Sequence, residues 1–133
     1  MVLATALIEE RYPPQVRIVE VSPRDGLQNE PAAVDVATKV ALIEALADAG
    51  LQAIECGSFV SKKYVPQMAD TAEVFGALRR APGVEYSVLV PNLKGLGAAV
   101  RSEMTDIAIF AAASESFFRF GVQPPATWHD IRS

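Results

Sequence analysis

The pattern of apolar positions along the chain alternates between two periods. Short runs of branched apolar residues predict strands at 16–21, 51–56, 86–90 and 107–110. Between these runs, apolar residues recur at helical spacing and predict helices at about 35–49, at 70–80 and after Asn92. This alternation of strand and helix predicts a parallel sheet with right-handed crossovers.

The predicted strands are nearly continuous apolar runs, which is typical of a parallel sheet covered by helices. The first helix has Asp35 at its predicted N-cap and Gly50 as its C-terminal stop. An open doubly wound sheet and part of a (β/α)8 barrel both fit this pattern. Periodicity does not separate them, although no glycine-rich dinucleotide fingerprint follows the first strand, which weakens the doubly wound alternative.

Composition indicates one folded domain. The chain has 133 residues, of which 50% are hydrophobic and 21% charged, as is typical of globular proteins. Its net charge of −4 gives no excess of positive charge that would bind nucleic acid or an anionic membrane. No run approaches the roughly 18 to 20 apolar residues of a membrane span. A single cysteine and an N-terminus without a basic leader predict a cytoplasmic protein with no nucleic-acid or membrane partner.

Polar residues follow the first predicted strand, at 22–30. Arg24 beside Asp25 puts a fixed cation next to a carboxylate where the strand ends. A carboxylate there can ligate a hard divalent cation, and a neighbouring guanidinium can stabilise a developing enolate. The structural alternative is a turn in which Asp25 caps the backbone and pairs with Arg24.

Polar side chains also end the later predicted strands. Glu55, in a buried strand, needs a partner, and Arg24 at the same end of the neighbouring strand is the natural one. Glu55 would then serve only as that ion-pair partner, or it would have a functional role, in which it either orients Arg24 or relays a proton. Asn92 is most simply the N-cap of the next helix, with substrate contact as the functional alternative. The small residues at 111–116 either admit a ligand to the backbone or form a capped turn.

Two reactive side chains have plainer explanations. Cys56 has no histidine near it in the sequence and no CxxC pattern, so we expect a buried structural thiol. His129 has no second ligand at metal spacing, so we expect it to be solvated. Neither is a candidate catalytic or metal-binding residue.

Five motifs occur in order along the chain and carry a resemblance to a known family. The run RIVEVSPRDGLQNE at 17–30 is the longest and most specific. The shorter ones are Ile54-Glu55 with 58–61 (SFVS), 65–68 (VPQM), 91–95 (PNLKG) and 112–115 (AASE). Together they cover about 14–117, and this part of the chain resembles the N-terminal half of the 3-hydroxy-3-methylglutaryl-CoA lyases.

The resemblance implies both a fold and a reaction. That family belongs to a group of metal-dependent TIM-barrel lyases and Claisen-type synthases, so we expect an α/β fold whose parallel (β/α) units form about four strands, the first half of a TIM barrel. By resemblance, Asp25 is a ligand of Mg2+ or Mn2+, Arg24 is a catalytic and substrate-binding residue, and Glu55 is its catalytic partner. The implied reaction is the retro-Claisen cleavage of an acyl-CoA thioester, 3-hydroxy-3-methylglutaryl-CoA, to acetyl-CoA and acetoacetate. This reaction is a step of leucine catabolism and ketone-body formation.

The chain departs from that family in its second half. A complete TIM barrel takes about 250 residues, and the family's His-x-His and asparagine metal ligands and its catalytic cysteine have no counterpart here. We therefore expect 1–117 to be the N-terminal half of the lyase domain and 118–133 to be a divergent, irregular tail, as in a truncated or frame-shifted product. With the remaining metal ligands absent, little or no activity is expected from this chain alone.

Two alternatives stay open. One is a non-catalytic half-barrel that associates with itself or with another chain, because a sheet cut from a barrel has two unpaired edges. A homo-oligomer formed through those edges is the expected assembly. The other is a Claisen-condensing synthase of the isopropylmalate or citramalate type, although the residues at 28–30 (QNE) favour the lyase.

Overall fold

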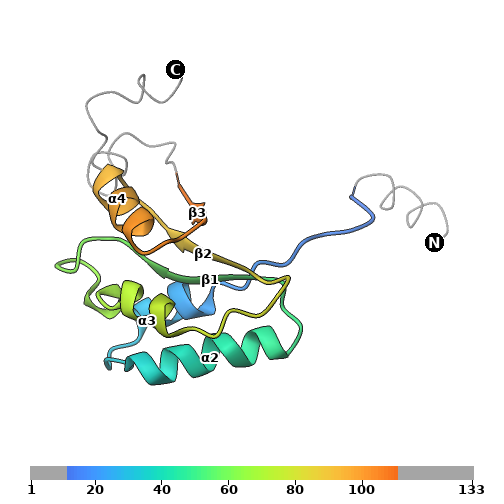
Figure 1. Ribbon diagram of the computed structural model, residues 1–133, viewed down its shortest axis with the longest axis horizontal. Coiled ribbons are helices and arrows are strands. Elements are labelled where there is room, and N and C mark those ends of the chain that lie inside the picture. Colours follow the sequence, from blue (N-terminus) through green and yellow to red (C-terminus); the bar gives the residue numbers. More distant parts are fainter. Residues whose placement is uncertain (1–11, 111–133) are drawn as a thin grey trace, which may run out of the picture.

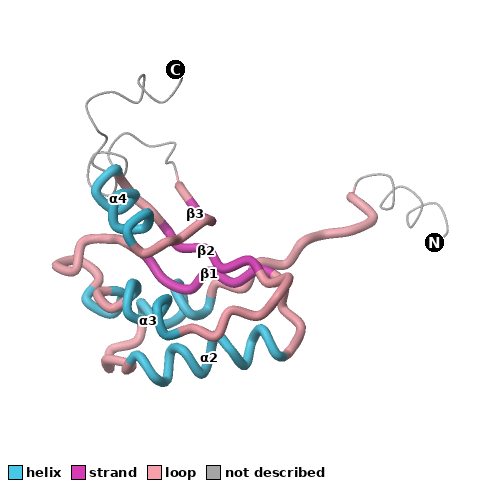
Figure 2. The backbone as a smooth tube through the Cα atoms, in the orientation of Figure 1, coloured by secondary structure: helices cyan, strands magenta, loops and turns pink. Residues whose placement is uncertain are grey.

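A computed structural model describes residues 12–110 (Figures 1 and 2). Within that range the sheet is parallel and ordered β1-β2-β3, with β1 at Ala53–Ser58, β2 at Glu85–Leu89 and β3 at Asp106–Ala108. The helices are α2 at Val36–Asp48, α3 at Thr71–Ala77 and α4 at Leu93–Arg101. Short helical turns are η1 at Ser22–Gly26, η2 at Leu27–Asn29 and η3 at Pro66–Met68. From α2 to β3, the order of helices and strands confirms the predicted β/α alternation.

The first predicted strand, at 16–21, is wrong. Only Glu20 pairs with the sheet, through an isolated parallel bridge to Ile54. In this bridge the Glu20 N–H donates to the Ala53 carbonyl at 2.9 Å and the Glu55 N–H donates to the Glu20 carbonyl at 2.8 Å. The chain then turns into η1, which ends the pairing, and the segment before Glu20 extends away from the sheet (Figure 1). Among the described residues, the sheet therefore has three strands rather than four and is not closed.

The predicted helix caps are confirmed. The Asp35 carboxylate accepts a hydrogen bond from the Thr38 N–H at 2.7 Å, and this bond lowers the pKa of Asp35. Gly50, with a φ of 98°, lies just beyond α2 in the left-handed conformation that glycine tolerates best. At α4, the Asn92 Oδ1 accepts from the Gly95 N–H at 2.9 Å. Both cap side chains satisfy backbone donors that a first helical turn leaves free.

The strand β1 lies two residues further along the chain than predicted. Gly57 and Ser58 continue the pairing with β2 after a register shift that follows Glu55. A small Gly-Ser pair is typical of a loop, but the Ser58 N–H donates to the Thr71 hydroxyl at 3.1 Å, which holds the strand end against α3. The strand therefore carries Ser58 to the carboxyl edge of the sheet.

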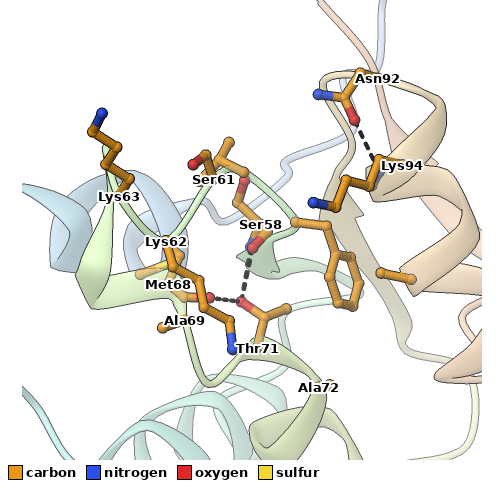
Figure 3. A pocket seen from close by; sticks show the side chains of 14 residues that line it. Ser58, Ser61, Lys62, Lys63, Met68, Ala69, Thr71, Ala72, Asn92 and Lys94 are labelled. Carbon is orange, nitrogen blue, oxygen red and sulfur yellow. Dashed lines mark hydrogen bonds between the residues drawn. The ribbon is translucent and has the colours of Figure 1, made fainter.

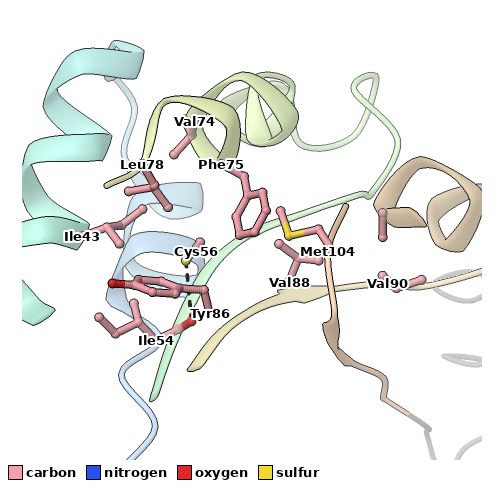
Figure 4. Close-up of a cluster of buried hydrophobic side chains, with 11 residues drawn as sticks. Ile43, Ile54, Cys56, Val74, Phe75, Leu78, Tyr86, Val88, Val90 and Met104 are labelled. Atoms are coloured by element: carbon pink, nitrogen blue, oxygen red, sulfur yellow. Dashed lines mark hydrogen bonds between the residues drawn. The ribbon is translucent and has the colours of Figure 1, made fainter. Parts of the chain in front are cut away.

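The hydrophobic core lies between the sheet and the helices (Figure 4). Ile54 of β1 and Val88 of β2 pack with Ile43 of α2 and Val74 of α3, and all are almost completely buried. Ala99 of α4 belongs to the same cluster. This packing fixes β1 and β2, whose carboxyl ends carry the polar residues described next. Of the helices described in residues 12–110, none is long and apolar enough to cross a bilayer.

Candidate active site

The polar loop predicted after the first strand is a helical turn, η1. The backbone N–H groups of Arg24 and Asp25 both donate to the Val21 carbonyl, at 3.0 and 2.7 Å. The Glu20 carboxylate accepts from the Ser22 N–H at 2.8 Å, and this hydrogen bond lowers the pKa of Glu20. These bonds fix the backbone of the Arg24-Asp25 pair beside β1.

Arg24 and Glu55 form an ion pair at this edge of the sheet. The Arg24 Nε donates to Glu55 Oε1. The Arg24 side chain is 17% exposed and that of Glu55 is 7% exposed, so each charge needs the other to offset its desolvation. The structure therefore confirms the predicted pairing of Arg24 with Glu55.

Asp25 lies on the solvent side of the same cluster. Its Oδ1 accepts from Arg24 Nη1 at 2.9 Å and from Gln28 Nε2 at 3.4 Å. The Asn29 side chain donates to the Asp25 carbonyl at 2.6 Å. The Asp25 side chain is 55% exposed, so its carboxylate is oriented by neighbours while staying accessible. Sequence reasoning assigned no role to Gln28 or Asn29, although both lie in the most specific motif.

The oxygen atoms of Asp25 are of the type that binds a hard cation, but few such ligands lie near it. A carboxylate oxygen is the ligand type that Mg2+ and Mn2+ prefer. Across residues 12–110, however, no group of three or more His, Cys, Asp or Glu side chains converges on a metal site. Asp25 therefore fits as one ligand of a coordination sphere that these residues do not complete.

A second polar feature is a pocket of about 530 Å³ beyond the end of β1 (Figure 3). The loop after β1, the start of α3 and the N-terminus of α4 form its walls. Asn92 lines the pocket with its cap intact, so the N-cap interpretation is confirmed and substrate contact stays a prediction. Sequence reasoning did not assign Ser58, Lys62 or Lys94, which also line it, as site residues. The available signal was their position at or soon after the carboxyl ends of two strands, β1 for Ser58 and Lys62 and β2 for Lys94.

Cys56 is a buried thiol, as predicted. Its side chain belongs to the core cluster, and burial, together with the neighbouring Glu55 charge, raises its pKa to about 12. A thiol held protonated at neutral pH is a poor nucleophile and metal ligand. The candidates at 111–116 and His129 lie outside the described residues.

Comparison with known proteins identifies the class. The sequence profile of the HMGL-like family matches residues 15–128, so the chain belongs to that family. It is 58% identical over 105 residues to a 3-hydroxy-3-isohexenylglutaryl-CoA/hydroxy-methylglutaryl-CoA lyase of Pseudomonas aeruginosa, covering 79% of this chain and 35% of that protein. It is 57% identical over 105 residues to the cytoplasmic 3-hydroxy-3-methylglutaryl-CoA lyase of Rattus norvegicus, covering 79% and 31%. A mitochondrial hydroxymethylglutaryl-CoA lyase of Macaca fascicularis is 54% identical over 113 residues, covering 85% and 35%.

Solved structures agree with the sequence matches. A hydroxymethylglutaryl-CoA lyase from Pseudomonas aeruginosa superimposes with a TM-score of 0.76 at 55% identity, over 83% of this chain and 37% of that one. An HMG-CoA lyase from Acinetobacter baumannii, in complex with coenzyme A and 3-methylmalate, gives a TM-score of 0.73 at 42% identity, over 76% and 33%. The chain thus has the fold of the N-terminal part of a TIM-barrel lyase of this class, and it spans about a third of the length of these relatives.

Proposed function

We propose that this chain supplies the N-terminal part of a carbon–carbon lyase that cleaves 3-hydroxy-3-methylglutaryl-CoA to acetyl-CoA and acetoacetate. The supporting observation is the cluster of Arg24, Asp25 and Glu55 at one edge of a parallel sheet, where α/β enzymes place their chemistry. The relatives named as lyases of this substrate support the assignment. The lyase part is taken as 1–117 and the remainder as a divergent tail, and the cytoplasm is its proposed location.

Arg24 is the proposed catalytic and substrate-binding group. Its Nε is held by Glu55 and its Nη1 by Asp25, while its Nη2 has no protein partner among the described residues. Retro-Claisen cleavage removes the proton of the C3 hydroxyl, whose oxygen becomes the ketone of acetoacetate, and breaks the C2–C3 bond. The bonding electrons leave with acetyl-CoA as an enolate, and a proton added at C2 completes the reaction. A guanidinium N–H aimed at the enolate oxygen stabilises that charge as it develops.

Glu55 and Asp25 have distinct proposed roles. Glu55 orients the guanidinium, because its buried carboxylate accepts from the Arg24 Nε. Asp25, half-exposed, is the proposed ligand of a divalent cation. When bound, such a cation, Mg2+ or Mn2+, polarises substrate oxygens and eases loss of the hydroxyl proton. Asn92 is kept as a proposed substrate contact because it lines the neighbouring pocket.

With one carboxylate ligand in residues 12–110, the metal affinity of this chain alone should be low and its activity slight. A half-barrel that associates is therefore the second candidate. It rests on exposed apolar side chains in and just after the edge strand β3, Ile107 and Ile109, and in the segment before Glu20, Val16 and Ile18. Sedimentation of the purified chain tests it, and a monomer that unfolds cooperatively would contradict it.

A chimaera tests the lyase proposal directly. Residues 15–110 would replace the matching part of the Pseudomonas aeruginosa lyase, and acetyl-CoA release from 3-hydroxy-3-methylglutaryl-CoA would be followed. The chimaera should cleave the substrate, and Arg24→Gln should lower kcat by about a hundredfold or more. The control is Arg79→Gln, at an exposed arginine paired with Glu44 and Asp48, which should leave the rate unchanged. A folded chimaera that condenses acetyl-CoA instead of cleaving would favour a synthase.

A further inference from the structure

The VPQM motif at 65–68 contains η3, and three contacts fix this turn to the body of the fold. The Lys39 Nζ donates to the Gln67 carbonyl at 2.6 Å. The Thr71 hydroxyl lies 2.9 Å from the Met68 carbonyl (Figure 3), and the Met68 side chain is buried. Because Lys39 is itself buried, the backbone of Gln67 is held by a bond that is shielded from water.

The side chain of Gln67 extends from this fixed turn to the end of η2. Its Nε2 donates to the Glu30 carbonyl at 3.1 Å. Glu30 is the residue at which η2 ends, and its own N–H donates to the Leu27 carbonyl at 3.2 Å. Among the described residues, the bond from Gln67 is the one hydrogen bond that joins 27–30 to a segment outside 20–30. Gln67 is therefore the tie between η2 and η3.

The turn η2 in its place orients Asp25. The Asn29 side chain donates to the Asp25 carbonyl at 2.6 Å, and Gln28 Nε2 donates to Asp25 Oδ1 at 3.4 Å. Both of these side chains belong to η2. Movement of η2 would therefore shift two of the groups that set the position of the Asp25 carboxylate.

Arg24 depends on η2 less than Asp25 does. The Arg24 guanidinium is held from the side of the sheet by the buried Glu55 carboxylate. The Asp25 side chain is 55% exposed, and its carboxylate has only Arg24 and Gln28 as partners among the described residues. A looser η2 should therefore displace the Asp25 carboxylate more than the Arg24 guanidinium.

We infer that Gln67 is a positioning residue, which holds η2 so that the Asp25 carboxylate is directed at the divalent cation of the proposed lyase. This inference rests on the proposed function, because that cation is part of it. Gln67 is not a ligand itself and acts through Glu30 and Asn29. A hydrogen bond that orients a metal ligand from outside raises the metal affinity without adding a ligand.

The variant Gln67→Met tests the inference, because it keeps the length of the side chain and removes its N–H donors. The matched control is Gln52→Met. Gln52 is exposed, and within residues 12–110 only its backbone carbonyl is hydrogen-bonded, to the Glu85 N–H. Both changes would be made in the lyase chimaera that carries residues 15–110.

Mn2+ binding to the chimaera, followed by electron paramagnetic resonance, is the first readout. It should weaken about threefold to tenfold in Gln67→Met and less than twofold in Gln52→Met. The Mn2+ concentration for half-maximal cleavage should rise by the same factor. At saturating Mn2+, kcat should change less than twofold, because Glu55 still holds Arg24. A loss of kcat that saturating Mn2+ does not restore would show a merely structural role and overturn the inference.

A double variant tests whether the effect passes through Asp25. In Asp25→Asn the Mn2+ affinity is already lowered, so adding Gln67→Met should change it less than twofold further. Losses that simply add would mean that Gln67 acts on the chimaera by another route, and they would overturn the inference.

Hydrogen exchange of the 133-residue chain reports on the loop without metal or substrate. In Gln67→Met, the backbone amides of 24–30 should exchange at least about threefold faster, while those of α2 and β1 keep their protection. Melting curves followed by circular dichroism verify that each variant is folded. Unchanged exchange at 24–30, or unchanged Mn2+ affinity in the folded variant, overturns the inference. A chimaera that binds Mn2+ without cleaving the substrate would overturn the lyase proposal instead, and the exchange and Mn2+ results would still decide the role of Gln67.

Discussion

Two buried cations in this chain are held in different ways. The Lys39 side chain is 5% exposed, and its Nζ donates to the Gln67 carbonyl at 2.6 Å and to both carboxylate oxygens of Asp70 at 2.7 and 2.8 Å. An ammonium has three donors, so Lys39 is fully satisfied by the protein. Arg24 is also largely buried, yet its Nη2 has no partner within residues 12–110 and its neighbour Asp25 is half-exposed.

The difference separates a structural ion pair from one that can act on a ligand. Lys39 joins α2 to the segment before α3, and nothing in that contact is left to bind another molecule. Arg24 is oriented by Glu55 through its Nε and by Asp25 through its Nη1, and only its Nη2 is left without a partner among the described residues. Burial and charge are similar in the two places, so the unused donor is the informative feature.

The largest expected effect comes from breaking the structural pair. Lys39→Met removes the cation and leaves Asp70 without its partner, so the free energy of unfolding should fall by about 3 kcal/mol. Asp70 retains some contact with water, which places the effect at the low end for buried pairs. Urea unfolding monitored by circular dichroism measures it.

Arg79→Met is the surface control for Lys39→Met. Arg79 contacts Glu44 at 3.7 Å and Asp48 at 3.4 Å from an exposed position, and removing such a pair should cost less than about 1 kcal/mol. Equal losses in the two variants would show that Lys39 is not a structural anchor.

The second prediction tests whether the Arg24–Glu55 pair has a role beyond stability. Glu55→Gln keeps a hydrogen-bond acceptor but removes the buried negative charge, so stability should fall by about 2 kcal/mol. In the lyase chimaera the same change should lower kcat with little change in KM, because it alters how the guanidinium is aimed. A stability loss without any change in kcat would make the Arg24–Glu55 pair structural, like Lys39–Asp70.

Sequence reasoning predicted one of these pairs and missed the other, for physical reasons. Arg24 follows one predicted strand and Glu55 lies near the end of the neighbouring one. Parallel topology alone therefore brings the two residues to the carboxyl ends of the strands. Lys39 lies in a helix whose polar positions are typical of a solvent-facing surface. Its burial depends on Asp70, which is 31 residues away in the sequence and was predicted only as the start of a helix.

In the fold, too, features that depend on adjacent residues were predicted, whereas features that depend on distant segments were not. The caps at Asp35 and Asn92 depend on a few adjacent residues and were predicted correctly. The strand at 16–21 was predicted from its apolar pattern, but a strand also requires a neighbour along its length, and only Glu20 has one. The pocket beyond β1 could not be predicted because three separate segments form it.

The smallest of the three effects at neutral pH uses Cys56 as a reporter on the interior beside Glu55. Burial raises the pKa of this thiol from 9.0 to about 12, with a lesser contribution from the Glu55 charge. Between those values the unfolded chain loses the thiol proton and the folded chain keeps it, so the folded state binds more protons. Stability should therefore fall as pH rises from 9 to 12, by about 1.4 kcal/mol per pH unit at most.

Cys56→Ala isolates this contribution, because it removes the titrating group and leaves the other bases of the chain unchanged. Below pH 8, the unfolding free energies of the two proteins should differ by a nearly constant amount. Above pH 9, the chain with Cys56 should lose stability relative to the alanine variant. Alkylation gives a second readout, since a buried neutral thiol should react with iodoacetamide only when the chain unfolds. Rapid alkylation of the folded chain at pH 8 would mean that the interior next to Glu55 is open to solvent. Arg24 and Glu55 would then not be a buried pair, and the comparison of Arg24 with Lys39 would not hold.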